Sequence, residues 1–272
     1  MNRCFAGHLG VRGPDAPLLQ HMAASHDPVD QIGLMAELGF AGVFDNYLLL
    51  RDEEDHLRIG AEVRRRAMRM GSFVHDPLRW DQPAWIDGSA LASLERTIAA
   101  AARTGAGSVT CITAGIRDPA KDRRGMAENL RRAADAIPAD GPLLCVEATH
   151  PAFAPGLLIE QVEDALDVVR LADHPKVRLA LDLGHVALHG RDPVEVIGLA
   201  ADRIGTVQIA DLPGRIEPGA GKLDWPAIFA ALDSAGYAGL LELELEPQEA
   251  GEAGERAMVA RLAGLGLGRS VT

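Results

Sequence analysis

The chain has 272 residues, of which 47% are apolar and 24% are charged, and its formal net charge is −12. This length and apolar fraction suffice for one large core, such as that of a single α/β barrel. The acidic balance argues against a groove for nucleic acid or contact with an anionic membrane, because both require basic residues.

Eight short apolar runs alternate with longer amphipathic stretches along the chain. Short, nearly continuous apolar runs are typical of parallel strands that are buried on both faces. The runs cover residues 4–9, 41–44, 68–75, 108–113, 143–147, 177–182, 206–209 and 239–246.

The stretches between the runs have the periodicity and the end signals of helices. In the first of them, Val29, Ile32 and Met35 share one face, and Gly39 follows its end. Asp224 stands where a helix N-cap belongs. The predicted helices cover residues 28–38, 52–66, 88–104, 122–137, 158–172, 193–201, 225–235 and 250–265.

Eight strand–helix repeats in a chain of this length predict one fold, a single (β/α)8 TIM barrel spanning residues 1–272. A doubly wound open sheet is the alternative, and it should have a glycine-rich turn that joins the first strand directly to a helix. The stretch "GHLGVRGPDAP" has glycines, but no helix follows closely. No break in composition indicates a second domain.

The cysteines and the apolar stretches bear on the compartment. Cys4, Cys111 and Cys145 have neither disulfide nor metal-ligand spacing, as expected in a reducing environment. No apolar stretch has the length of a signal-peptide core or a membrane span. We therefore expect a cytoplasmic protein, monomeric or homo-oligomeric, that binds a small-molecule substrate and neither nucleic acid nor membrane.

The predicted strands end in polar residues, which matters because TIM barrels place their chemistry at the C-terminal strand ends. Glu242, Glu244 and Glu246 alternate with leucines, so they share one face of the last strand. The strand-end residues are His8, Asp45, His75, Thr113, Glu147, Asp182, His185, Gln208, Asp211 and Glu244.

Four of these residues predict a metal site. Glu147, Asp182 and Glu244, with the amide oxygen of Gln208, form a hard oxygen-rich set that suits Mg²⁺ or Mn²⁺ better than Zn²⁺. A salt bridge or a solvated rim would explain any one acid alone, but the four together favour a metal. His185 is a candidate for a hydrogen bond to a substrate or to a metal ligand, or it is a rim histidine.

One segment carries a family resemblance. The stretch "QIADLPGRIEPGAGKLDWPAIFAAL", followed by "GYAGLLELE", resembles the xylose isomerase-like superfamily of sugar isomerases and epimerases, and most closely its hydroxypyruvate isomerase branch. "NLRRAAD", "VEATHP" and "DLGH" have looser counterparts, and "FVHDP" places His75 where the third strand should end.

The resemblance implies a single divalent metal held by Glu147, Asp182, Gln208 and Glu244. It also implies that Glu147 and Glu244 act as the acid/base pair. The substrate's oxygens would then be held by His185 and Arg215, and His75 is a further candidate for binding the substrate.

The long loop after Gln208 would carry Arg215 over the mouth of the barrel. Asp211 and Glu217 would fix its path, and Gly219 and Gly221 would allow close approach or sharp turns. A purely structural pair between Arg215 and Glu217 is the alternative.

The predicted reaction is isomerisation or epimerisation of a small hydroxy-carbonyl compound through an enediolate. The chain departs from the branch at Glu246, where a lysine is usual, and at Phe44 and Ala148. The alternatives are a metal-dependent dehydratase and a non-catalytic sugar-binding relative. A DNA-repair endonuclease on the same barrel would need several zinc ions and a basic face, which the net charge opposes.

Overall fold

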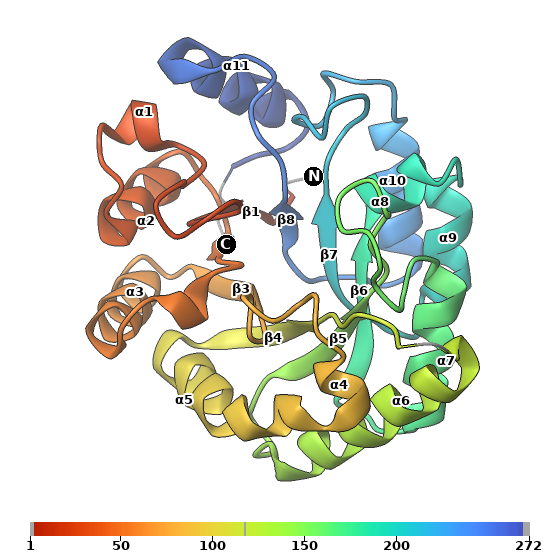
Figure 1. Ribbon diagram of the computed structural model, residues 1–272. Coiled ribbons are helices and arrows are strands. Elements are labelled where there is room, and N and C mark those ends of the chain that lie inside the picture. Colours follow the sequence, from red (N-terminus) through yellow and green to blue (C-terminus); the bar gives the residue numbers. More distant parts are fainter. Residues whose placement is uncertain (1–2, 117, 269–272) are drawn as a thin grey trace.

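The computed structural model describes residues 3–116 and 118–268. Its strands form a closed parallel barrel in which each strand pairs with its neighbours in the sequence (Figure 1). The pairing of Phe5 with Leu241 closes the ring, so the predicted TIM barrel is confirmed. The strands are β1 (Phe5–His8), β2 (Gly42–Phe44), β3 (Arg69–Val74), β4 (Ala106–Cys111), β5 (Leu143–Glu147), β6 (Val177–Asp182), β7 (Ile204–Ile209) and β8 (Leu241–Leu243).

Eight long helices surround the barrel and correspond to the eight predicted ones (Figure 1). In the part of the chain that the structure describes, no helix is both long enough and apolar enough to cross a membrane. The long helices are α2 (Pro28–Glu37), α3 (Glu53–Arg65), α5 (Leu94–Thr104), α6 (Pro119–Ala136), α7 (Val162–Ala172), α9 (Pro193–Ala200), α10 (Trp225–Ser234) and α11 (Gly251–Gly264).

Some helix boundaries differ from the predictions for local reasons. The helix predicted from residue 88 begins only at Leu94, because Gly88 is left-handed and Ser89–Ser93 forms a 3-10 helix. α6 begins three residues earlier than predicted, because Asp118 caps its amides and Pro119 starts it. Short helices also occupy the strand-to-helix loops, namely α1 (Gln20–Ala23), η1 (Leu48–Leu50), α4 (Ala84–Asp87) and α8 (Leu183–Leu188).

A fully buried acid, Glu242, lies inside the barrel on β8. Its Oε1 accepts a hydrogen bond from the Ser72 amide (2.7 Å), and its Oε2 lies 2.6 Å from the Ser72 hydroxyl. Gly71 makes room for it, since a Cβ there would stand 2.3 Å from Oε1. Of the three alternating glutamates, Glu242 and Glu244 therefore point inward, whereas Glu246 lies beyond the strand and pairs with Arg12.

We expect Glu242→Gln to raise the free energy of unfolding at pH 8 and to change it much less at pH 5. Burial raises the pKa of Glu242 from 4.5 to about 7, against the hydrogen bonds from Ser72. The folded protein therefore holds this proton more tightly, and stability is lost as pH rises through 7. A glutamine keeps both Ser72 contacts without ionising, so the gain is about 1–3 kcal/mol.

Denaturant unfolding of both proteins at the two pH values, in the presence of a chelator, measures this effect. Cys145 and Tyr237 also lie near Glu242, and burial raises the pKa of each, so they stay neutral over this range. An equal change in stability at pH 5 and pH 8 would show that ionisation of Glu242 is not the cause.

Candidate active site and metal centre

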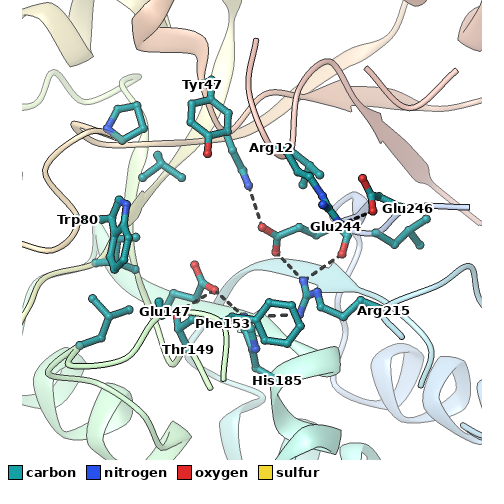
Figure 2. Close-up of a pocket in the computed structure, with 18 of the residues that line it drawn as sticks. Arg12, Tyr47, Trp80, Glu147, Thr149, Phe153, His185, Arg215, Glu244 and Glu246 are labelled. Atoms are coloured by element: carbon teal, nitrogen blue, oxygen red, sulfur yellow. Dashed lines mark hydrogen bonds and ion pairs between the residues drawn. The ribbon is translucent and has the colours of Figure 1, made fainter. Parts of the chain in front are cut away.

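A cavity of about 350 Å³ opens at the C-terminal ends of the strands. This volume is in the range of small-molecule sites. Charged residues line one part of it, among them Glu147, His185, Arg215 and Glu244. Tyr47 and Trp80 lie across the pocket from Arg215, so the pocket has a charged side and an aromatic side (Figure 2).

The strand register brings three predicted ligands to the lumen face. Asp182 on β6 pairs in register with Gln208 on β7, and Glu147 on β5 pairs with Ala180, two residues before Asp182. Side chains two residues apart on a strand, and register partners on parallel strands, point to the same face. All three ligands are buried, and the period of the strands thus gathers them at one place.

The geometry adds His185 to this group. Asp182 ends β6 and caps α8, where its Oδ1 accepts the His185 amide at 2.9 Å. This turn places the His185 Nε2 3.5 Å from Glu147 Oε1 and 3.7 Å from Asp182 Oδ2. Ligand atoms of Glu147, Asp182 and His185 lie within 4.8 Å of one another, close enough to hold a metal ion.

Gln208 provides an independent indication of a cation. Its side chain is 1% exposed, and its Oε1 has no hydrogen-bond partner among the described residues. A buried amide oxygen without a partner costs free energy, unless a group absent from the protein chain contacts it. Carboxylate, amide and imidazole groups around one space fit a divalent metal.

Glu244 and Arg215 complete the charged side. The Arg215 Nη2 donates to Glu244 Oε2 at 3.1 Å (Figure 2). It also donates to Asp182 Oδ2 at 2.8 Å, while Asn46 donates to Glu244 Oε1 at 2.8 Å. Phe153 lies over the Arg215 guanidinium at 5.1 Å and edge-on to His185. Arg215 therefore contacts two of the predicted metal ligands.

Burial and neighbouring charges raise the pKa of two of the acids and lower that of the third. Burial, then the charges of Glu244 and Asp182, raise the pKa of Glu147 well above its usual value. Burial also raises the pKa of Glu244 to about 8, despite the charge of Arg215. Burial works to raise the pKa of Asp182 too, but Arg215 and His185 reverse that shift and hold it low. Asp182 is thus the acid that stays ionised.

Asp211 organises the loop that carries Arg215. Three groups donate to its Oδ1, namely the amides of Leu212, Lys222 and Leu223, at 2.8–3.1 Å. Another three donate to its Oδ2 at 2.8–3.0 Å, which are the amides of Gly219 and Gly221 and the indole of Trp225. The predicted role of Asp211 is confirmed.

The structure explains why glycine is required at two positions of the loop. A Cβ on Gly221 would stand 2.2 Å from the Asp211 carboxylate, and Gly219 has a positive φ of 87°. Glu217 is buried against the Gln248 amide (2.8 Å) and Arg261 (3.3 Å). The alternative pairing of Arg215 with Glu217 is therefore wrong.

His75 lies apart from the other predicted site residues. Its ring nitrogens lie 2.9 Å from the Thr97 hydroxyl and 3.0 Å from the Ala90 carbonyl, and its ring packs on Trp85. His75 is not among the residues that line the cavity. The structure thus brings together Glu147, Asp182, His185, Arg215 and Glu244, with Gln208 beside them in register, but not His75.

Sequence reasoning missed several residues of the pocket. Asn46 donates a hydrogen bond to Glu244 and directly follows the strand-end residue Asp45. Its place at the end of a strand could have identified it as a residue of the site. Asp45 itself is turned away in a buried pair with Arg51 at 2.6 Å. Tyr47, Trp80 and Phe153 lie in loops where no periodic pattern points to them.

Comparison with known families agrees with this geometry. Residues 32–262 match the family described as xylose isomerase-like TIM barrel. The chain belongs to this family. The resemblance inferred from the loop after Gln208 is therefore confirmed over most of the chain.

Two curated relatives are named as isomerases. The 2-oxo-tetronate isomerase of Pectobacterium atrosepticum is 31% identical over 141 residues, which cover 50% of this chain and 54% of that protein. The hydroxypyruvate isomerase of Escherichia coli is 30% identical over 133 residues, covering 49% and 52%. The aligned part thus spans about half the length of each of these relatives.

A solved structure matches nearly the whole chain. The protein is described as an AP endonuclease, family 2, from Brucella melitensis, and it is 25% identical with a TM-score of 0.79. The match covers 93% of this chain and 96% of that one.

Proposed function

We propose that this chain is a divalent-metal-dependent isomerase or epimerase of a small hydroxy-carbonyl compound. The observation that carries the proposal is a set of four residues at the ends of neighbouring strands, beside a cavity of small-molecule size: Glu147, Asp182 and Gln208, which are buried, and the partly buried Glu244. The names of the curated relatives support the same class of reaction.

Glu147, Asp182, Gln208 and Glu244 would hold the metal through oxygen, with the His185 imidazole as an adjacent nitrogen donor. The predominance of oxygen favours Mg²⁺ or Mn²⁺. When bound, such an ion polarises a carbonyl group and stabilises the negative charge of an enediolate. The acids themselves supply the rest of the chemistry.

Glu147 and Glu244 are the acid/base pair of this proposal. One removes a proton from a carbon atom beside the carbonyl, and the other returns a proton to the neighbouring carbon or to the opposite face. Thr149 donates to Glu147 Oε1 (3.2 Å) and Asn46 donates to Glu244 Oε1 (2.8 Å), so one oxygen of each carboxyl is fixed. The second oxygen of Glu244 accepts from Arg215 at 3.1 Å.

His185 and Arg215 are the proposed contacts for substrate oxygens, and Tyr47 and Trp80 would exclude water on the opposite side. The enclosed volume suits a small molecule. A DNA-repair activity is disfavoured by the net charge of −12 and by the single cluster of possible metal ligands among the described residues.

Deuterium uptake from D₂O tests the proposal. Metal-stripped protein is incubated with a panel of ketoses, aldoses, hydroxypyruvate and other 2-oxo acids, first without metal and then with Mg²⁺ or Mn²⁺. We expect metal-dependent exchange at the carbon beside the carbonyl of one class, and chelation should stop it. Exchange with loss of water would identify a dehydratase instead, and binding without exchange would identify a non-catalytic relative.

A further inference from the structure

The guanidinium of Arg215 fills the space between two acids that the proposed function assigns to the metal. Its Nη2 lies 2.8 Å from Asp182 Oδ2, 3.1 Å from Glu244 Oε2 and 3.0 Å from the Glu244 carbonyl. Its Nη1 lies 3.5 Å from the His185 Nε2. One side chain thus reaches three members of the charged group at once, and Figure 2 shows two of them, Glu244 and His185.

This position offsets the repulsion between buried acids. Asp182 is 2% exposed and Arg215 is 9% exposed, so water screens their charges poorly. Asp182 stays ionised, and a buried charge without a partner is costly, so removal of one partner of a buried ion pair typically destabilises a protein strongly. Arg215 thus places its positive charge between Asp182 and Glu244.

The same position conflicts with a bound metal. Mg²⁺ binds carboxylate oxygens at about 2.0–2.1 Å and carries two positive charges. The Oδ1 of Asp182 already accepts from the His185 amide, and the Oε1 of Glu244 accepts from Asn46. A metal that uses the remaining oxygens, Oδ2 and Oε2, would lie in the space where Nη2 now contacts both of them. The guanidinium and the metal therefore compete for the same pair of acids.

The backbone of Arg215 has little freedom to resolve this conflict. Its carbonyl accepts the Glu246 amide at 3.2 Å, and Asp211 holds both ends of its loop. The Arg215 side chain has more freedom, because one of its faces is covered by the ring of Phe153, and that ring is itself 54% exposed. Rotation of the side chain toward the cavity is the route by which the guanidinium can leave.

We infer that Arg215 is an exchangeable counter-ion, which neutralises Asp182 and Glu244 in the absence of metal and leaves both when a divalent metal binds. This inference rests on the metal site of the proposed function. The released guanidinium turns into the cavity, where substrate oxygens can hold it. Metal and substrate then favour each other's binding, because each stabilises the same side-chain position.

Calorimetric titration of the metal-stripped full chain with Mn²⁺ tests this exchange. We expect Arg215→Gln to bind Mn²⁺ at least tenfold more tightly than the unaltered protein, because no guanidinium has to be displaced. The metal-free variant should also melt at a lower temperature, and saturating Mn²⁺ should narrow that difference. Adding Asp182→Asn to the variant should abolish the tight binding and so locate the ion.

Arg12→Gln is the matched control. Arg12 also lines the cavity, but it is exposed, pairs with Glu246 and makes no recorded contact with Asp182 or Glu244. Its removal should change the Mn²⁺ affinity less than about threefold, as expected for an exposed charge. Equal gains in the two variants would mean that only long-range charge matters, and this would overturn the exchange.

Two other outcomes are also decisive. Unchanged or weaker Mn²⁺ binding by Arg215→Gln would overturn the inference while leaving the metal site intact. If neither the unaltered protein nor Arg215→Gln binds Mn²⁺ or Mg²⁺, the metal site of the proposed function fails, and the exchange fails with it.

Discussion

Glu147→Gln and Glu244→Gln should each reduce the metal-dependent net turnover of the substrate by about 10²–10⁴-fold. An amide cannot accept a proton from carbon, although it fills the same space and keeps a hydrogen bond to Thr149 or Asn46. Because removal and return of the proton require different acids, both variants should lose net turnover. A single-turnover measurement by mass spectrometry separates the proton step from product release.

The control for this pair is Glu242→Gln, a buried acid on the same strand that does not line the cavity. It should keep the exchange rate within a few-fold of the unaltered protein. Mn²⁺ titration of all three variants then separates loss of proton transfer from loss of metal. Retained net turnover in either Glu147→Gln or Glu244→Gln, with metal bound, would refute the two-glutamate mechanism.

Asp211→Asn should release the loop that carries Arg215. Burial works to raise the pKa of Asp211, but the hydrogen bonds from the Trp225 indole and the backbone amides outweigh it and lower that pKa, so the side chain is ionised. An asparagine presents a donor to three of the six groups that now donate to the carboxylate. We expect a local loss of about 3–5 kcal/mol, since bonds to a charged acceptor are strong.

Amide hydrogen exchange is the measurement that detects this release, because a loop can open without unfolding the barrel. The amides of Gly219, Gly221, Lys222 and Leu223 should exchange at least 10²-fold faster, and kcat/KM should fall. Asp224→Asn is the control, since Asp224 only caps α10 through the Ala227 amide at 3.1 Å and its loss should leave the loop protected. Unchanged protection in Asp211→Asn would mean that other contacts fix the loop.

The sequence alone determined the barrel and the acids at its mouth. Each strand is a short, nearly continuous apolar run, and each helix is a local pattern with a period of 3.6 residues, so both are visible in short windows of sequence. The ends of the runs then placed Glu147, Asp182, Gln208 and Glu244 at one edge of the barrel, because parallel strands end together. The loop glycines were also predictable, because Gly219 and Gly221 lie close to Asp211 in the sequence and their amides donate hydrogen bonds to its carboxylate.

Only the tertiary structure decided which charged groups meet. Arg215 pairs with Asp182 and Glu244, 33 and 29 residues away, rather than with Glu217 two residues along the chain. Arg12 reaches Glu246 across 234 residues, a contact that no local pattern encodes.

His75 occupies a strand-end position like the other predicted residues, yet Thr97 and Ala90 draw its ring away from the cavity. Strand and helix periods fix which residues reach the mouth of the barrel. Which charged side chains pair at the mouth depends on the distances between segments that are far apart in sequence and on how deeply each side chain is buried. These distances are set only when the barrel closes.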